Sequence, residues 1–472
     1  MTDVNGVSNL ISNAQTITSA ERLGNYLGLF AELEQRSAQQ SAWVRSLREN
    51  AFARFCEIGF PTTKDEDWRF TNISAISKTP FQLTRDANAP VQRESLQPFL
   101  VPGAACRLVF VNGRFASALS DLPSPPAGIK IGSLSEALAR DSSTIEPHLG
   151  RHLKINRDAF TALNTALFED GAFVYLPRRT MIKKPISLLF ISLPGNEPTM
   201  AHPRNLIVAG EDSQASIVED YVSLGSGVFF SNVVTELIAG DNSVLSHYLI
   251  EREEAQALNV STLFTQQGRT SNVASHSVLL GGALVRNNVH PVLAGEGAEC
   301  LINGLFIGKD RQHLDNYMLV EHAAPRCSSR QFYNGILDGR AHGVFHGRII
   351  VHKDAQKTDA KQTNRNLLLS DDAQIDTKPQ LEIYADDVKC THGATIGQVE
   401  EEALFYLRSR GIDELAARAL LLFAFASQCL DRMTCAPVRE YLQNQVQQWL
   451  PEGSSSSALS AKETERQWEE VG

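Results

Sequence analysis

The stretch NLIVAGEDSQASIVEDYVSLGSGVFFSNVVTELIAGDNSVLSHYLIE, residues 205–251, decides the fold. Its short β-prone runs are separated by Gly, Asp and Asn, which favour turns. Turn glycines recur at Gly210, Gly240, Gly268 and Gly295, separated by 30, 28 and 27 residues. A β-solenoid coil needs a comparable length, because each coil must return the chain above its starting point. The spacing therefore predicts a β-solenoid whose coils carry two or three short strands each.

The same alternation of short β-prone runs and turn residues extends over residues 170–398, where helical periodicity is nearly absent. The alternative is a β-sandwich, which also combines short strands with regular turns. Turns in a sandwich usually recur at a shorter spacing of about 8–12 residues. The longer spacing favours the solenoid, and we expect residues 170–398 to form its core.

Residues 1–169, which precede this core, have a mainly helical pattern with one hairpin. In SAWVRSLRENAFARFCEIGF, residues 41–60, apolar side chains recur at steps of three and four, and Pro61 ends the pattern. Further along, RLVFVNGRFASAL places Asn112 and Gly113, the preferred pair of a type I′ turn, between two β-prone arms. We therefore expect an N-terminal helix that ends before Pro61 and a tight hairpin at Asn112-Gly113.

Helical periodicity returns in residues 399–450. EEEALFYLRSRGI begins with three acidic residues, which the helix dipole favours at an N-terminus, and stops at Gly411. Asp413 can cap a second helix that is apolar on nearly every side and so must be covered on more than one side. A third helix follows Pro437, and the Ser-rich tail 451–472 is expected to be disordered. The zones together predict an α+β chain, with a solenoid core between two helical regions.

Composition and charge narrow the classes of function. The chain has 472 residues, of which 43% are hydrophobic and 21% charged, as expected for a globular protein of two or three packed regions. The net charge of -10 argues against nucleic acid as a partner, and no apolar run reaches the roughly 20 residues that span a bilayer. The N-terminus also lacks the basic and apolar segments of a secretory signal. We expect a cytoplasmic protein that binds neither nucleic acid nor membrane.

The sharpest local chemical feature is Cys390-Thr391-His392. Residues two apart in a strand share a face, so the thiol and the imidazole would point the same way and could bind a soft or borderline metal. The plainer alternative is a buried cysteine beside a surface histidine. Two ligands do not complete a metal site, so the others must come from elsewhere in the fold or from another subunit.

The other cysteines and histidines predict less chemistry. Seven scattered cysteines without a Cys-x-x-Cys pair indicate reduced thiols and argue against a zinc knuckle or a ferredoxin-type site. His342, His346 and His352 would share one strand face, but residues four apart in a strand lie about 13 Å apart, too far for one ion. A polar outer face of the solenoid is the better interpretation of these three histidines.

Enzyme motifs are weak in this sequence. Asp386 and Asp387 could indicate a polysaccharide-cleaving site, because such sites use paired acids. That hypothesis expects an export signal and aromatic sugar platforms, and the sequence shows neither. Phosphate-binding and serine-nucleophile motifs are absent as well. The sequence therefore offers binding surfaces more readily than a self-contained active site.

Two stretches carry a family resemblance. KTDAKQTNRNLLLSDDAQIDTKPQLEIYADDVKCTHGATIGQVEEEALFYLRSRGI, residues 357–412, resembles the SufB/SufD family of iron–sulfur cluster assembly scaffolds. PTTKDEDWRFTNIS, residues 61–74, is similar to the N-terminal signature of the SufD-type members, and the likeness covers most of residues 40–450. It implies a right-handed parallel β-helix flanked by helical regions, and a scaffold without enzymatic turnover of its own.

The resemblance also implies partners and cargo. SufD-type members pair with SufB through the β-helix, and the ATPase SufC binds the C-terminal helices, giving a complex of one SufB, two SufC and one SufD. Tyr406, Arg408 and Arg410 lie in the segment beside the expected SufC dock, and an over-apolar helix nearby fits the same role. A transient iron–sulfur cluster or iron is expected at the subunit interface, with no stable cofactor in the isolated chain, which could form a homodimer.

In this family the histidine of the C-T-H-G-A-T motif, here His392, lies at the SufB interface and contributes to cluster assembly, with Cys390 as a second candidate. SufB-type members have a scaffold cysteine upstream and a glutamate after the motif histidine. This chain has Asp371-Asp372-Ala373-Gln374 upstream and Gly393 after His392, which favours the SufD type. The resemblance therefore implies iron acquisition and cluster formation shared with SufB. A SufB-like homo-oligomeric scaffold and a β-helix carbohydrate-active enzyme are the alternatives.

Overall fold

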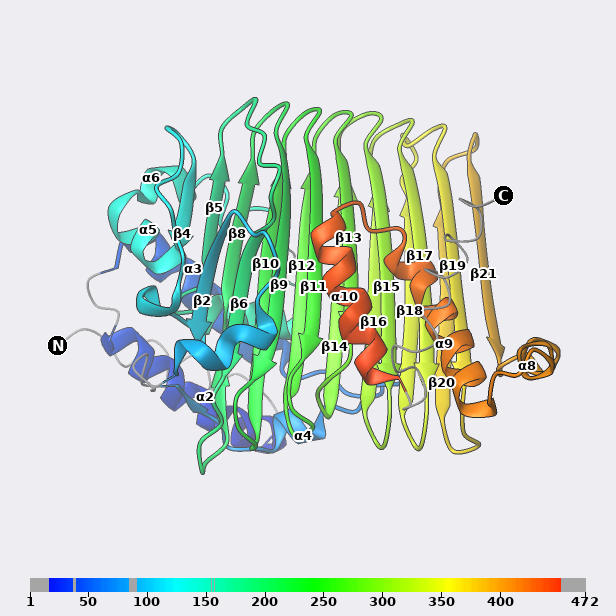
Figure 1. Cartoon of the computed structure of the whole chain (residues 1–472). Helices are drawn as coiled ribbons and strands as arrows, with labels where there is room; N and C mark the ends of the chain where they lie inside the picture. The colour runs from blue at the N-terminus through cyan, green and yellow to red at the C-terminus, as the bar shows by residue number, and fades with distance from the viewer. Residues whose placement is uncertain (1–16, 37–39, 85–90, 154, 157, 451–472) are drawn as a thin grey trace.

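The computed structural model describes residues 17–36, 40–84, 91–153, 155–156 and 158–450. Over these residues the chain is a long β-solenoid with helices on both flanks, which confirms the α+β fold class (Figure 1). The tail predicted to be disordered, 451–472, lies outside the described residues. In the part of the chain that the structure describes, no helix is both long enough and apolar enough to cross a bilayer.

The solenoid consists of two facing sheets between which the chain alternates, giving about eight coils from the pair β5–β6 to the pair β20–β21 (Figure 1). Successive coils pair in parallel. Sheet A contains β4 (Lys130–Ser133), β5 (Ala172–Leu176), β8 (Arg204–Ala209), β10 (Phe229–Ala239), β12 (Leu258–Gln267), β14 (Leu284–Leu293), β16 (His313–His322), β18 (His342–Val351) and β20 (Gln374–Ile383), with β1 (Gln82–Leu83) and β7 (Thr199–Ala201) beside it. Sheet B contains β2 (Cys106–Val111), β3 (Arg114–Phe115), β6 (Ile186–Ser192), β9 (Gln214–Ser223), β11 (Val244–Arg252), β13 (Asn272–Leu279), β15 (Glu299–Gly308), β17 (Ser328–Leu337), β19 (Asp359–Leu368) and β21 (Lys389–Gly397).

The helices lie outside the two sheets. Those on the N-terminal side are α2 (Ile17–Arg36), α3 (Ala42–Ile58), α4 (Ser74–Ser77), α5 (Leu134–Arg140), α6 (Ser142–Ile145) and α7 (Ala159–Leu167), with short 3₁₀ turns η1 (Glu66–Trp68), η2 (Arg93–Phe99) and η3 (Ser117–Leu119). Those on the C-terminal side are α8 (Glu401–Ser409), α9 (Glu414–Leu430) and α10 (Ala436–Trp449).

The turn glycines stack at one corner of the solenoid, as their spacing predicts. The amide of Gly240 donates to the carbonyl of Ala209 (2.8 Å), and the amide of Gly268 donates to the carbonyl of Ala239 (2.8 Å). The coils approach so closely here that a methyl group on Gly295 would lie 2.1 Å from a backbone nitrogen of the preceding coil. Glycine is therefore required by packing between coils at this corner.

The predicted strand length was wrong. Each coil carries two long strands, mostly of 8–11 residues from β9 onward, where the sequence suggested two or three short ones. Some glycines that look like turn signals lie inside strands. Gly304 is within β15, because the ring of Tyr333 in the next coil fills the space of its missing side chain; a methyl group there would lie 2.0 Å from that ring. Such glycines accommodate large neighbours and do not end the strand.

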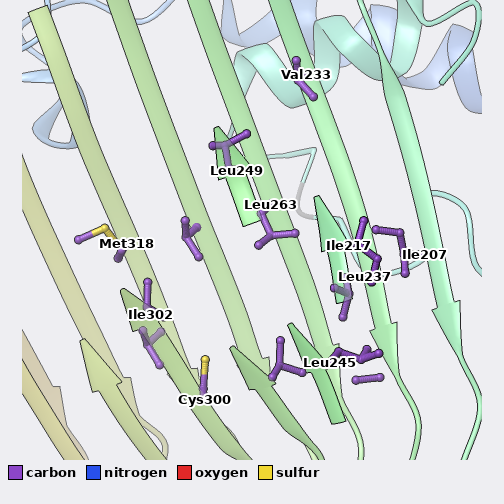
Figure 2. Packing of buried hydrophobic residues seen from close by; sticks show 14 of the residues in the cluster. Ile207, Ile217, Val233, Leu237, Leu245, Leu249, Leu263, Cys300, Ile302 and Met318 are labelled. Carbon is purple, nitrogen blue, oxygen red and sulfur yellow. The ribbon is translucent and has the colours of Figure 1, made fainter. Parts of the chain in front are cut away.

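The main core fills the space between the two sheets. Aliphatic side chains from both sheets, among them Leu237, Ile302 and Met318, project into this interior (Figure 2). These side chains are almost fully buried, and together they form one cluster that extends through successive coils. Since each buried aliphatic side chain contributes about 1.5–3 kcal/mol, this continuous interior is the main source of stability.

The N-terminal region covers the outer face of sheet A and extends both sheets. Helices α2, α3 and α7 pack there against residues of β10 and β12. The predicted hairpin at Asn112-Gly113 is confirmed: both residues have positive φ, 51° and 78°, and Phe110 pairs with Phe115 in antiparallel register. The predicted helix before Pro61 is also confirmed, as α3. Because β2 pairs with β6 in parallel, this region belongs to the same sheet as the core.

The C-terminal helices α9 and α10 cross the outer face of sheet B (Figure 1). Asp413 caps α9 as predicted, since its carboxylate accepts a hydrogen bond from the amide of Ala416 (3.0 Å). Leu422, Phe425 and other apolar side chains of α9 are buried against the sheet. The apolar surface of α9 is thus covered by the solenoid of its own chain.

Candidate functional site at the open end of the solenoid

The last two strands, β20 and β21, end the solenoid on its C-terminal side. Strand β20 pairs only with β18, and β21 pairs only with β19, within the residues that the structure describes. The outer backbone edge of each strand therefore faces solvent, and such edges are templates for pairing with another chain. We call this surface, made of β20 and β21, the open end.

Cys390 and His392 both lie on β21 at the open end. Cys390 is registered with Ala360 of β19, is half-buried and packs against the interior cluster, and its burial raises the pKa of the thiol. His392 is registered with Gln362 and is exposed. The regular strand places His392 on the same face as Cys390, at the mouth of the solenoid interior, as the sequence predicts.

Beneath His392 the interior becomes polar. Gln362 is 1% exposed and donates from Nε2 to Oε1 of Gln331 in the preceding coil (2.6 Å). Asn364 and Asn366 on the same strand are also buried and hydrogen-bond to each other. Sequence reasoning missed these residues. The signal that could have found them is the coil period, because Gln331, Gln362 and His392 are separated by 31 and 30 residues.

Apolar side chains are exposed around the open end. Ile396 of β21 is 52% exposed, and Ile383 and Tyr384 at the end of β20 are 40% and 63% exposed. In the preceding coil, Val351 and Asn366, which are registered with Ile383 and Ile396, are both buried. Exposed apolar side chains beside unpaired strand edges are typical of a surface that binds another protein.

The open end does not hold a complete metal site by itself. Among the described residues, no group of three or more His, Cys, Asp or Glu side chains could hold a metal ion. Cys390 and His392 offer one sulfur and one nitrogen, which fit a soft or borderline metal such as iron in donor type but not in number. Further ligands would have to come from another molecule.

The three histidines predicted to share a strand face have separate partners, and His346 is buried. His342 hydrogen-bonds to Asp376 (2.8 Å) and His346 to Gln380 (2.9 Å), both on β20. His352 lies 3.4 Å from Glu321. His342 and His346 therefore help to attach the last coil, and the three histidines do not converge on one point.

Helix α8 projects beyond the open end (Figure 1). None of its residues is buried. Phe405 and Tyr406 are 73% and 57% exposed. Arg410 donates to the hydroxyl of Tyr406 (3.2 Å), and Arg408 forms an ion pair with Glu414 (3.3 Å). The structure therefore places Tyr406 and Arg408 on one exposed helix and Arg410 at its C-cap, separate from Cys390 and His392 on the strand.

Sequence comparison identifies relatives over nearly the whole chain. Residues 191–425 match the family described as SUF system FeS cluster assembly, SufBD core domain, and residues 20–188 match the SufBD protein N-terminal region. An iron–sulfur cluster assembly SufBD family protein of Synechocystis is 34% identical over 87% of this chain and 92% of its own length. The iron–sulfur cluster assembly protein SufD of Escherichia coli is 32% identical over 92% of this chain and 98% of its own length. The SufD protein of Bacillus subtilis is 25% identical over 88% of this chain and 95% of its own length.

Proposed function

This chain belongs to the SufBD family and acts in iron–sulfur cluster assembly by the SUF system, and from that premise we propose that it is a scaffold subunit without catalytic turnover in a SufB–SufC–SufD complex. In this proposal it contributes to iron acquisition and to cluster formation at its interface with SufB. The observation that carries the proposal is the position of His392, exposed on the terminal strand β21.

The open end is the proposed SufB surface. Its two unpaired strand edges can continue into the sheets of a second solenoid, since pairing would satisfy backbone groups that otherwise face water. Ile383, Tyr384 and Ile396 would lose their solvent exposure in the same contact. A partner of matching β architecture, as SufB is expected to be, fits this surface better than a small ligand does.

His392 and Cys390 are the proposed contribution to the shared site. Iron and the nascent cluster are cargo there, and a neutral imidazole nitrogen of His392 would be one ligand. The Cys390 thiol has a raised pKa, so it would lose its proton only as metal binds. SufB would supply the remaining ligands, which accords with the incomplete set within the described part of this chain.

Helix α8 is the proposed SufC dock. It presents Phe405, Tyr406, Arg408 and Arg410 to solvent, while α9 is covered by sheet B. Aromatic and arginine side chains are common anchors of protein interfaces. In this proposal the contacts with SufC lie mainly on α8, within the C-terminal helices that the family resemblance implies.

Two further observations support the proposal. The first bears on the role as a scaffold, and the second on a reducing compartment such as the cytoplasm. The cavity beside Glu219 and His247 in the solenoid interior has a volume of only about 10 Å³, room for about one water molecule. All seven cysteines are free thiols, as expected where disulfides do not persist. The small cavity fits a chain whose function depends on its surfaces, and the free thiols fit a reducing compartment.

The test is reconstitution of the complex under anaerobic conditions. Wild-type chain, His392→Ala and His352→Ala are each purified with SufB and SufC, and iron, sulfide and the rate of cluster formation are measured. His352 is a matched control, because it is another exposed histidine of the solenoid with its own partner, Glu321. We expect normal complexes in all three cases and a lower cluster yield only for His392→Ala. An unchanged rate and iron content in that variant would remove His392 from the mechanism.

Purification of the chain alone separates the proposal from a homo-oligomeric scaffold. We expect no stable cluster without SufB, because the ligand set is incomplete. A cluster with stoichiometric iron and sulfide in the isolated chain would favour the SufB-like alternative.

A further inference from the structure

An interior column of side chains runs through the last three coils of sheet B. Gln331 of β17 is registered with Gln362 of β19, and Gln362 with His392 of β21. Gln331 and Gln362 are 2% and 1% exposed, so both amides lie inside the solenoid. His392 is the outermost member of the column and the only one of the three that reaches solvent.

The Gln362 amide is held on one side and unsatisfied on the other. Its Nε2 donates to Oε1 of Gln331 (2.6 Å). Its Oε1 is buried and has no hydrogen-bond partner in the isolated chain. A buried acceptor without a partner costs about 1–3 kcal/mol, so this oxygen is poised to accept a donor.

A glycine on the facing sheet keeps the amide in place. A methyl group on Gly347 of β18 would lie 1.7 Å from Nε2 of Gln362. The amide therefore occupies the space that a side chain at position 347 would fill. With sheet A on one side and Gln331 beneath, the amide has little freedom to turn away from the column.

The geometry points to Gln362 as the positioning residue of His392, an inference that rests on the proposed function of that histidine. Stacked amides in neighbouring strands form ladders in which each side chain donates to one neighbour and accepts from the other. Strands lie about 4.8 Å apart, so the next donor above Gln362 is the side chain at position 392. In the assembled site the imidazole of His392 donates its Nδ1–H to Oε1 of Gln362.

This hydrogen bond decides which nitrogen is available to iron. With Nδ1–H directed inward at Gln362, Nε2 carries a lone pair directed outward, toward the partner. Histidines that bind metals usually donate their other ring N–H to a carbonyl or carboxylate, which fixes the tautomer and orients the ring. Gln362 supplies such a carbonyl group from 30 residues upstream.

The test reads the tautomer of His392 directly. The full-length chain, labelled with ¹⁵N in its histidines, is studied by NMR at pH 8 alone and with SufB and SufC, and the His392 signals are assigned by their loss in His392→Ala. We expect the Nδ1–H tautomer to dominate in the complex. Gln362→Met, which keeps the length but removes the acceptor, should return the ring to the Nε2–H tautomer that a free neutral imidazole favours. Gln362→Glu, which keeps an acceptor, should restore Nδ1–H, and Gly347→Ala should act like Gln362→Met.

Gln267→Met is the matched control. Gln267 is fully buried, donates from Nε2 to the carbonyl of Glu299 (2.9 Å) and also has an Oε1 without a partner, but it lies far from His392 at the end of β12. Gln267→Met should lower the free energy of unfolding about as much as Gln362→Met does, and it should leave the tautomer of His392 unchanged. Loss of an outer-shell partner typically weakens metal binding 10–100-fold, so cluster formation should slow by about tenfold or more in Gln362→Met alone.

An unchanged tautomer in Gln362→Met would overturn the inference while leaving the proposed role of His392 intact. The proposed function fails separately, if His392→Ala reconstitutes clusters at the wild-type rate. A tautomer change of the same size in Gln267→Met would also overturn the inference, because it would reflect general loosening of the solenoid.

Discussion

At the scale of single residues, burial fixes the charge state of two histidines that take no part in the open end. Burial lowers the pKa of His202 and of His276 to about 3. His276 also lies near His247, stacks on the ring of Tyr248 and hydrogen-bonds to Asn303. Both imidazoles are therefore neutral in the folded chain at pH values where an exposed histidine is charged.

These shifts predict an acid sensitivity with a defined sign. Each histidine has a folded-state pKa below its unfolded value of about 6.5, so below pH 6.5 the unfolded chain binds a proton that the folded chain does not. The free energy of unfolding is therefore highest above pH 6.5 and falls as the pH decreases toward 3. Each histidine should lower the free energy of unfolding at pH 5 by about 2 kcal/mol relative to its value at pH 7.5. His276→Gln does not titrate. Its unfolding free energy should therefore fall by about 2 kcal/mol less than that of wild type between these pH values, as measured by denaturant titration.

The exposed His352 provides the control for this comparison. His352→Gln makes the same substitution at a histidine whose side chain is 48% exposed, so it controls for the exchange itself. The account of buried neutral histidines is wrong if His276→Gln and His352→Gln show the same pH dependence as wild type.

Local periodicity could predict some site residues but not others. Cys390 and His392 are two apart, so a strand pattern alone places them on one face. Gln362 could not be assigned in this way, because its place beneath His392 depends on the register between coils. Register between coils is set by corner lengths and packing along the entire solenoid, which one stretch of sequence does not contain.

At the scale of elements, α8 and α9 have opposite surroundings although they are consecutive. Helix α9 buries its apolar side chains against sheet B, and α8 buries none. The sequence predicted both helices and the Asp413 cap, because those signals are local. It could not predict which helix would remain exposed, since an apolar helix is covered equally well by its own chain or by a partner.

The exposed helix yields a prediction for SufC binding. The double variant Phe405→Ser, Tyr406→Ser should weaken SufC binding at least about tenfold, because it removes two exposed aromatic anchors. Its unfolding free energy should change by no more than about 0.5 kcal/mol per site, as is usual for exposed positions. Calorimetric titration with SufC measures the first effect and denaturant unfolding the second.

Met181→Ser is the control, since Met181 is 63% exposed on a different part of the solenoid. It should bind SufC like wild type. Unchanged SufC affinity in the α8 variant would contradict the assignment of this helix as the dock.

At the scale of the whole molecule, the two ends of the solenoid differ. On the N-terminal side the antiparallel strands β3 and β4 close the sheets, with α5 and α6 beside them (Figure 1). On the C-terminal side β20 and β21 leave their edges unpaired within the described residues. Stacked repeats need a cap at each end to protect the interior, so the uncapped end of the described residues is the feature that the proposed SufB contact would explain.

The solenoid itself could be predicted from the sequence, because the glycine spacing reports the length of a coil. The open end could not be predicted from residues alone. The sequences of β20 and β21 resemble those of the preceding strands, with β-prone runs such as LEIY around Ile383. Their exposure follows only from their place as the last coil, which is a property of the chain's topology.

Hydrogen exchange of the chain with and without SufB tests the central claim most directly, namely that the open end is the surface that SufB completes. Amides of β20 and β21 should exchange fast in the isolated chain and become strongly protected in the complex, with the N-terminal helices unchanged. Protection confined to other surfaces, with β21 exchanging equally fast in both states, would contradict the account.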